Sequence, residues 1–270
     1  MSARRGASTS ASTTEDGPAT ASRLPGYPPL IEVRVGRHSF RVVDDEFAAF
    51  WERVTDGDWE PHSFAVIDHF VSSGLTFVDI GAWIGPLSLY AAHLTDRCHA
   101  IEPDGRARAC LEANIALNPP LAERIVVHPV AIAERPGVAR LGSITSAVGG
   151  DSMSSLLFGD ADASWPVECV TLEAFVSTLP PGPLGLVKID IEGYEVSVLE
   201  GSRSYLAASH PPLYLSVHAS FWDEPRPIME RLLDLLSTYR ELLTPALEPI
   251  APDDLLDDDH LSGLFELVAV

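Results

Sequence analysis

Acidic side chains stand close to the ends of three apolar runs in this 270-residue chain. The first run contains Asp79 and leads into a turn with Gly81 and Gly85, after which Pro86 opens a helix. An apolar strand, a glycine turn and a helix start form the ligand crevice of a doubly wound α/β sheet. The Gly-x-x-x-Gly spacing differs from the Gly-x-Gly-x-x-Gly of pyrophosphate sites. A carboxylate here would repel a diphosphate and suits a cationic ligand, so we predict a site for S-adenosylmethionine.

The second run ends in Glu102, which is followed by Pro103 and Asp104. An acidic residue about twenty positions beyond a glycine turn is placed to accept hydrogen bonds from two ribose hydroxyls. Dinucleotide-binding folds use the same device, so an NAD-dependent oxidoreductase remains an alternative, which the glycine spacing disfavours. Asp104 has a simpler alternative function, that of capping the following helix.

The third run carries Lys188, Asp190 and Glu192, and the next strand ends in His218. Because strand residues alternate between faces, the first three side chains would share one side of the sheet. Two neighbouring carboxylates raise the pKa of one of them, and imidazole titrates near neutral pH. We therefore predict Asp190, Glu192 and His218 as catalytic residues, with binding of a divalent metal as a further possibility. The structural alternative is a salt-bridged strand end, with Glu195 capping the next helix.

Strands and helices alternate from residue 75 onward. Strands are predicted over 75–80, 98–102, 125–130, 185–190 and 213–218, with a closing pair near 240–247 and 263–269. Helices are predicted over 86–95, 104–117, 194–208 and 225–238. This order predicts an α/β fold with a Rossmann-like, doubly wound, mostly parallel seven-stranded sheet and an antiparallel edge hairpin. The stretch 138–170 interrupts the alternation, and we expect it to loop over the crevice.

The chain is expected to have three parts. Residues 1–29 are rich in Ser, Thr, Ala, Pro and Gly and are predicted to be a disordered tail. Residues 30–73 should form a hairpin and two helices that cap the main domain, residues 74–270. Within this cap, Trp51 and Trp59 have two alternative functions, to floor a substrate pocket or to pack the cap.

Composition excludes several classes of function. A net charge of -21 with a single lysine disfavours nucleic acid as a partner, because phosphate backbones are bound by Lys and Arg. No apolar run approaches the ~20 residues of a membrane span. Three cysteines without metal spacing or an even-numbered disulfide framework favour a reduced cytoplasm. The aspartates of 253–259 lack the spacing of a calcium loop, so a solvated loop is expected there.

The motifs together resemble the FkbM-type methyltransferases, a branch of the class I S-adenosylmethionine-dependent fold. The matching segments run in the family's order across about 75–220: Phe77–Gly85, Ile101–Asp104, Asn114 with Asn118, Val170–Glu173, Ile189–Glu195 and Val198–Gly201. The Lys-Ile-Asp-x-Glu-Gly run is the specific part of this resemblance. One departure is Trp83, which stands where the family commonly has asparagine.

The resemblance implies methyl transfer, usually to oxygen, on sugars, polyketides and related natural products of secondary metabolism. It places Asp79, Gly81 and Gly85 at the methionine end of S-adenosylmethionine and Glu102 at its ribose. The full set of cofactor-binding residues that we predict is Asp79, Gly81, Ala82, Gly85, Glu102, Pro103, Asp104 and Ala131. The expected partner is a small-molecule acceptor. Carboxyl or nitrogen methylation and a non-catalytic S-adenosylmethionine-binding protein remain alternatives, and the sequence does not determine the oligomeric state.

Overall fold

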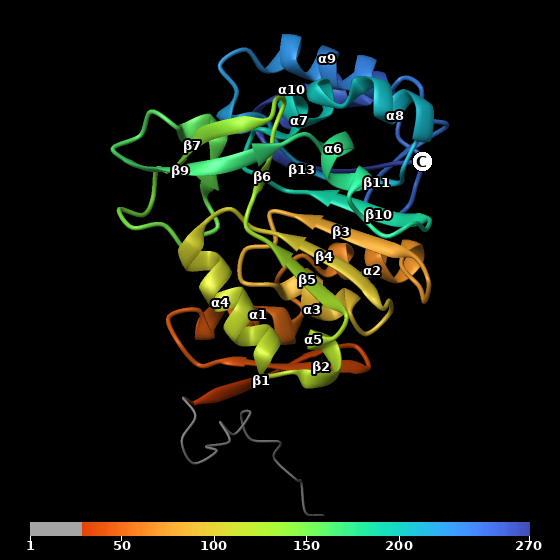
Figure 1. The fold of residues 1–270 in the computed structure, drawn as a ribbon. Helices are drawn as coiled ribbons and strands as arrows, with labels where there is room; N and C mark the ends of the chain where they lie inside the picture. The colour runs from red at the N-terminus through yellow and green to blue at the C-terminus, as the bar shows by residue number, and fades with distance from the viewer. Residues whose placement is uncertain (1–28) are drawn as a thin grey trace, which may run out of the picture.

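A seven-stranded sheet forms the centre of the computed structural model, which describes residues 29–270 (Figure 1). Its order is β12 (Leu242–Leu243), β13 (Leu264–Ala269), β11 (Leu213–His218), β10 (Leu184–Ile189), β3 (Thr76–Ile80), β4 (Arg97–Ile101) and β5 (Ile125–His128). The strands from β11 to β5 are parallel, and β13 pairs antiparallel with both β11 and β12. The predicted fold class, with its antiparallel edge, is confirmed. The predicted tail lies, except for residue 29, outside the described residues.

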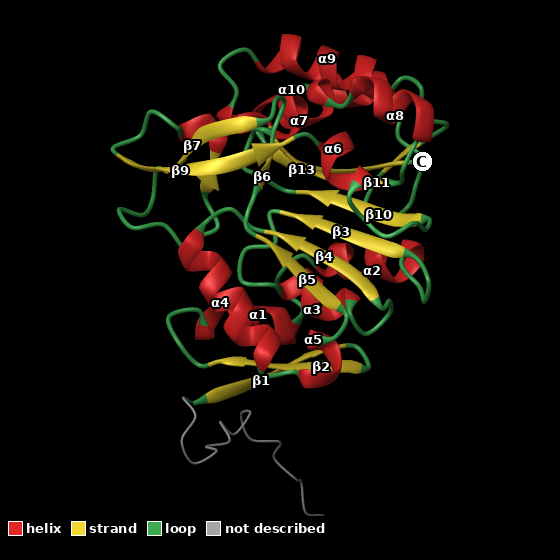
Figure 2. Ribbon diagram, viewed as in Figure 1, coloured by secondary structure: helices red, strands yellow, loops and turns green. Residues whose placement is uncertain are grey.

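Helices cover both faces of this sheet (Figure 2). Strand β3 shows the pattern, because Phe77 packs into one core cluster and Val78 and Ile80 into the other. The Phe77 face is covered by α1 (Ala48–Asp56), α2 (Pro61–Phe70), α3 (Pro86–Ala91) and α4 (Gly105–Ala116), and the Val78 face by α6 (Leu172–Ser177), α7 (Glu195–Gly201), α8 (Arg203–Ser209) and α9 (Pro225–Leu236). Burial on both faces explains why these strands are continuous apolar runs.

A hairpin precedes the central sheet in the chain. Strands β1 (Leu30–Val35) and β2 (His38–Val43) pair antiparallel and lie beside α4 and α5 (Pro119–Ala122) in Figure 1. Two asparagines of the family motifs hold β2 in place. Asn114 Oδ1 accepts from the Val43 N–H, and Asn118 both accepts from the Arg41 N–H and donates to its carbonyl. The backbone of an edge strand is thereby satisfied by side chains.

The segment 138–170 differs from its prediction. About half of it forms strands of a second, four-stranded sheet in the order β6 (Ala131–Ile132), β9 (Ala163–Val170), β7 (Gly137–Ser143) and β8 (Ser154–Ser155). These strands lack the continuous apolar run that marks a buried strand in the sequence, because only alternate residues of β9, such as Val167 and Cys169, are buried. The part that lines the two cavities described below is Leu141 of β7 and residues 151–156, which run from the β7–β8 connection through β8 into η1 (Leu156–Phe158).

Two smaller corrections concern the carboxyl-terminal half. The single helix predicted over 194–208 is divided at Ser202 into α7 and α8. The acidic run 253–259 is helical rather than a loop, in η3 (Pro252–Leu256) and α10 (Asp258–Ser262), although its aspartates are exposed. A further short element is η2 (Ala219–Phe221). Within 29–270 no helix has the length and apolar character needed to cross a membrane.

Candidate active site

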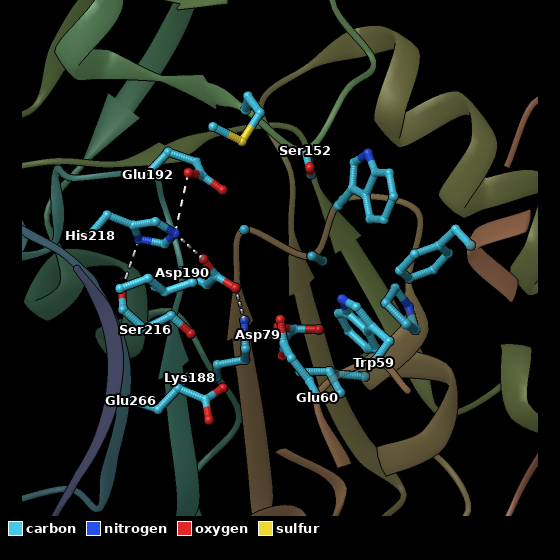
Figure 3. Close-up of a pocket in the computed structure, with 18 of the residues that line it drawn as sticks. Trp59, Glu60, Asp79, Ser152, Lys188, Asp190, Glu192, Ser216, His218 and Glu266 are labelled. Carbon is cyan, nitrogen blue, oxygen red and sulfur yellow. Dashed lines mark hydrogen bonds and ion pairs between the residues drawn. The ribbon is translucent and has the colours of Figure 1, made fainter. Parts of the chain in front are cut away.

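A cavity of about 650 Å³ lies at the carboxyl ends of β3, β10 and β11 (Figure 3). Its volume is within the range of small-molecule sites. Four titratable side chains predicted as functional line it, namely Asp79, Asp190, Glu192 and His218. The chain thus brings the glycine turn and the predicted catalytic residues to one hollow, as the rule for parallel sheets requires.

His218 is the centre of a buried polar cluster in this cavity. Its Nδ1 lies 3.0 Å from Glu195 Oε1. Its Nε2 lies 3.2 Å from Glu192 Oε2 and 3.8 Å from Asp190 Oδ1. The other oxygen of Asp190, Oδ2, accepts a 2.7 Å hydrogen bond from Lys188 Nζ. Glu195 therefore sets the orientation of the ring, and Nε2 is directed toward two carboxylates.

The charges of the cluster shift its protonation. Burial opposes a charge on His218, but Glu195, Asp190 and Glu192 outweigh it and raise the imidazole pKa to about 9. Burial raises the pKa of Glu192 to about 7, despite the opposing effect of His218. Burial also disfavours the Asp190 carboxylate, but Lys188 and His218 hold its pKa below the ordinary value. At neutral pH, His218 is therefore an imidazolium, and Glu192 beside it is partly protonated because the pH is close to its pKa.

The turn after β10 holds Glu192 in an unfavourable backbone conformation. Glu192 has a φ of 56° and is followed by Gly193 at 95°. The left-handed region costs roughly 1–2 kcal/mol for a residue with a side chain. The fully buried Glu195 offsets this cost by stabilising the turn, because its Oε1 accepts hydrogen bonds from the N–H groups of Ile191 and Gly193. Strain of this kind, imposed on a residue that lines a cavity, indicates a functional role.

Asp79 and Lys188 occupy the other end of the cavity. They are cross-strand partners on β3 and β10, on the face of the sheet that α2 covers. Asp79 Oδ2 accepts a 2.6 Å hydrogen bond from Ser88 Oγ. Its Oδ1 is buried and has no hydrogen-bond partner among residues 29–270, and burial raises the pKa of this carboxyl. An unsatisfied carboxylate oxygen lining the cavity suits a cationic group of a ligand.

Glu102 lines a narrow second cavity of about 50 Å³ beside the first. Its Oε2 accepts from the Trp83 N–H at 2.8 Å and its Oε1 from the Asp104 N–H at 2.7 Å, so the carboxylate is fixed in place. The neighbouring lining residues include Pro103 and Ala131, both predicted cofactor residues. An oriented carboxylate next to apolar side chains fits a ribose with its attached base.

Two predicted cofactor residues line neither of these cavities in the described structure. Gly85 precedes α3 with a φ of 95° and packs near Leu111, so it shapes the turn. Asp104 caps α4, since its Oδ1 accepts from the N–H groups of Arg106 and Ala107. Gly81 and Ala82, by contrast, line the larger cavity.

Trp83, the departure from the family pattern, connects three parts of the site. It adopts a φ of 48° and lines both cavities. Its indole Nε1 donates to the Gly150 carbonyl at 3.0 Å, and its ring packs edge-on against Phe47 and Phe50. The indole therefore links the glycine turn to the β7–β8 connection and to the segment before β3, which an asparagine is too short to do.

Three further glutamates belong to the site but were not predicted from the sequence, namely Glu60, Glu195 and Glu266. Glu195 was assigned only a capping function, yet its side chain holds His218. Glu60 lies between Trp59 and Pro61, immediately before α2. The Trp-Glu-Pro sequence at this helix start was the only local pattern that could have indicated a functional role for Glu60. Trp59 lines the cavity, whereas Trp51 is buried in the core.

Comparison with known proteins identifies the family. The family model of the methyltransferase FkbM domain matches residues 79–242, more than half of the chain. The chain belongs to the FkbM methyltransferase family. The family and the methyltransferase class predicted from the motifs are confirmed. No curated protein matches the chain.

Solved structures similar to this FkbM-family chain are distant in sequence. Methyltransferase FkbM from Methylobacillus flagellatus KT is 16% identical over 84% of this chain, with a TM-score of 0.47, and the chain spans 61% of its length. An rRNA methylase from Streptococcus thermophilus is 8% identical over 77% of this chain and 92% of its own, with a TM-score of 0.43. A TehB-like SAM-dependent methyltransferase from Corynebacterium glutamicum is 12% identical over 83% and 94%, with a TM-score of 0.41.

Glu102 should make the stability of this FkbM-family protein depend on pH. Burial raises the pKa of Glu102 to about 8, above the value of 4.5 for an exposed glutamate. A raised pKa contributes stability that is complete below the unfolded value and is lost as the pH rises through the folded value. This pKa shift corresponds to roughly 4 kcal/mol of stability lost between pH 5 and pH 8.5, so the melting temperature of Glu102→Gln should fall less over that range than that of the wild type, by roughly 7–15 °C.

Thermal unfolding at both pH values measures this difference, and Glu112→Gln, on the exposed side of α4, is the control. Equal slopes for Glu102→Gln and the wild type would show that Glu102 ionises normally. Glutamine keeps only one of the two acceptor oxygens, and this loss shifts the melting temperature by an amount that does not depend on pH. The slope of the melting temperature with pH therefore reports the ionisation of Glu102.

Proposed function

We propose that this protein is an S-adenosylmethionine-dependent methyltransferase that methylates a hydroxyl group of a small metabolite such as a sugar or a polyketide. The observation that carries the proposal is the common cavity, in which the glycine-turn carboxylate Asp79 and the cluster of Asp190, Glu192 and His218 line the same 650 Å³. A methyl donor at the turn and an acceptor at the cluster would then lie next to each other.

The residues present fit the methyl donor. Asp79 offers the unsatisfied Oδ1 to a cationic group, and Glu102 offers an oriented carboxylate to the ribose hydroxyls. Pro103 and Ala131 would lie against the base. When bound, S-adenosylmethionine supplies an electrophilic methyl group.

The Glu192–His218 pair is suited to remove the proton of the acceptor hydroxyl. Glu192 Oε2 is buried and forms an ion pair with His218 Nε2, but it makes no hydrogen bond to any described residue, so it retains the capacity to accept one. The proton of the hydroxyl would pass to this oxygen as the methyl group is transferred. The imidazolium 3.2 Å away favours the ionised form of Glu192, whose pKa of about 7 leaves a share of it as carboxylate at neutral pH. Glu195 acts as a positioning residue by holding Nδ1.

Calorimetry and a labelling assay test the proposal. The protein should bind S-adenosylmethionine and should transfer its labelled methyl group to members of a panel of sugars and polyketides. Transfer only to amines or to carboxylic acids would replace O-methylation by nitrogen or carboxyl methylation. Binding without any transfer would favour a non-catalytic binding protein, and binding of NADH alone would favour an oxidoreductase.

A divalent-cation centre is a second candidate function for Asp190, Glu192 and His218. One ligand atom from each lies within 4.8 Å of the others, and Glu195 contacts the remaining imidazole nitrogen as outer carboxylates do in metal sites. Asp190 Oδ1 stays available because Lys188 binds Oδ2.

Removing bound metal with a chelator and then adding Mn²⁺ tests whether the three residues form a cation site. If the three residues hold a cation, Mn²⁺ should bind to chelator-treated protein, and Glu195→Gln should weaken its binding by about 10- to 100-fold. Paramagnetic resonance of Mn²⁺ measures the binding, with Asp257→Asn, which alters an exposed aspartate–histidine pair, as the control. Full turnover in chelator, with no Mn²⁺ bound at millimolar concentration, would exclude the centre.

We also propose a small-molecule acceptor rather than nucleic acid, since a net charge of -21 disfavours phosphate backbones. A reduced compartment such as the cytoplasm is consistent with the free thiols of Cys98, Cys110 and Cys169.

A further inference from the structure

The connection between β7 and β8, residues 144–153 and here called the strap, contributes to the walls of both cavities. Ser152 and Met153 line the larger cavity, and Asp151 and Ser152 line the smaller one. Figure 3 shows Ser152 across the larger cavity from Lys188. A ligand that fills either cavity would therefore touch the strap.

Two side chains of the main domain hold the backbone of Gly150 in the strap. The Gly150 carbonyl accepts a 3.0 Å hydrogen bond from Trp83 Nε1, and the Gly150 N–H donates a 2.8 Å hydrogen bond to Asp104 Oδ2. The hydroxyl of Ser154, just beyond the strap, lies 3.3 Å from the same oxygen of Asp104. The two hydrogen bonds to Gly150, here called the latch, keep the strap against the main domain.

Glu102 connects the latch to the predicted ribose site. Its carboxylate accepts hydrogen bonds from the backbone N–H groups of Trp83 and Asp104, the same two residues whose side chains hold Gly150. These two residues follow β3 and β4, so one buried carboxylate fixes both halves of the latch. A carboxylate has about four acceptor positions, which leaves about two for ribose hydroxyls. Ligand binding at Glu102 and closure of the strap therefore involve the same residues.

The strap passes very close to the main domain beside the latch. A Cβ atom on Gly149 would lie 2.6 Å from Asp104 Oδ2 and 2.6 Å from Cη2 of Trp165, and Gly149 has a φ of 75°. Only glycine fits both this backbone conformation and this distance. The glycine pair 149–150 therefore allows the backbone of the strap to reach Asp104.

The remainder of the strap is held mainly by its own hydrogen bonds. The Asp151 carboxylate accepts from the hydroxyl groups of Ser143 and Thr145. Ile144 and Val148 are exposed, so these apolar side chains do not attach the strap to the main domain. A segment with few buried apolar contacts opens locally at a low cost in free energy. The latch is thus the main attachment that opening has to break.

The smaller cavity does not have room for a ribose and its base in the present position of the strap. Its volume of about 50 Å³ would hold one or two water molecules at about 30 Å³ each, whereas small-molecule sites have about 300–1,000 Å³. One wall consists of Ile80 and Ile101 from the central sheet, and the other includes residues 151–156. Because the sheet is the buried core of the protein, the strap is the wall that has to move.

We propose that the strap opens to admit the methyl donor and closes over its ribose, and that Trp83 and Asp104 are positioning residues that hold the strap closed. The inference rests on the proposed function, since the ligand that passes the strap is the methyl donor of that same site. Trp83 stands in place of the asparagine that is common in the family, so the indole half of the latch distinguishes this chain from the common pattern.

The rate constants for binding and release of S-adenosylhomocysteine test the latch. Trp83→Phe removes the indole donor and keeps an aromatic ring. Asp104→Asn keeps an oxygen that caps α4, but its amide nitrogen cannot accept from the Gly150 N–H. Both variants retain the backbone N–H groups that Glu102 binds. The control is Asp257→Asn, because Asp257 caps the exposed α10 in the same way.

Stopped-flow tryptophan fluorescence measures both rate constants, and Trp59, which lines the larger cavity, remains as a reporter in every variant. Thermal unfolding of each variant identifies any that fails to fold. The two latch variants alter different elements, so each of them tests the strap independently.

Association and dissociation should both become faster in the two latch variants, each by about 3- to 10-fold, because the loss of one hydrogen bond favours the open strap. The dissociation constant should change by less than about threefold, since the closed strap is destabilised with and without ligand alike. A merely structural defect at the ligand contacts would accelerate dissociation alone. That result, or rate constants equal to those of Asp257→Asn, would overturn the strap.

Hydrogen exchange of the ligand-free protein separates the strap from the proposed function. The amides of residues 144–153 should exchange faster in both latch variants than in the wild type, whereas those of β10 should keep their wild-type rate. Unchanged exchange of the strap in both variants would overturn it, whatever the binding result. Wild-type protein that binds no S-adenosylhomocysteine would contradict the methyltransferase proposal, and the exchange experiment would still test the strap. Normal binding with unchanged exchange would remove the strap alone.

Discussion

Replacing His218 by Gln should lower the turnover number by about 100- to 10,000-fold, the range in which a positioned proton acceptor contributes. The affinity for S-adenosylmethionine should stay within about twofold, because Asp79 and Glu102, which would bind this molecule, lie on other strands. The physical reason is the loss of the imidazolium 3.2 Å from Glu192. Without that charge, burial and the carboxylates Asp190 and Glu195 would raise the pKa of Glu192 further, and the base would be protonated at neutral pH.

Single-turnover kinetics with labelled methyl donor measure this effect once an acceptor is known, and calorimetry measures the affinity. Glu192→Gln should show the same loss, since it removes the accepting oxygen. His260→Gln is the matched control, because His260 forms a comparable 2.7 Å pair with Asp257 at the exposed α10. Wild-type turnover in His218→Gln would contradict the assignment of the pair as proton acceptor.

Replacing Gly81 by Ala should destabilise the fold by at least about 3 kcal/mol, within the class of large single-substitution effects. A Cβ atom on Gly81 would lie 1.9 Å from the carbonyl oxygen of Asp190, where backbone atoms cannot both remain in place. Gly81 also has a φ of 85°. The tips of β3 and β10 would have to separate, so Asp79 and Asp190 would no longer line the same cavity, and binding of S-adenosylhomocysteine should be lost.

Urea unfolding and calorimetry check this prediction. Gly74→Ala is the control, because Gly74 has a nearly identical φ of 84° but nothing described lies within 4 Å of its Cβ position. That variant should lose only the roughly 1–2 kcal/mol of the left-handed conformation. Equal losses at the two positions would show that close packing of the strand tips does not matter.

The central sheet and the gathering of Asp79, Asp190, Glu192 and His218 could be predicted from the sequence. Strands buried on both faces are continuous apolar runs, and such runs are a strong local signal. The carboxyl ends of parallel strands meet at one edge of the sheet, so a polar residue at the end of each run is placed without coordinates. The small second sheet escaped prediction because its strands are buried only at alternate positions.

The partners of these side chains were not predictable. Glu195 holds His218 only because a turn with a positive φ at Glu192 brings α7 back toward the strand end. Glu60 comes from a segment far away in the chain, yet its charge raises the pKa of Lys188 in the same cavity.

The sequence by itself therefore determined which strands form the sheet and which polar residues stand at their ends, because both follow from local burial patterns and from the fixed geometry of parallel strands. Only the tertiary structure decided which carboxylate orients the imidazole, and which oxygens are left without a donor. Those outcomes depend on turn conformation and on contacts between distant segments, and neither is encoded in the spacing of residues along the chain.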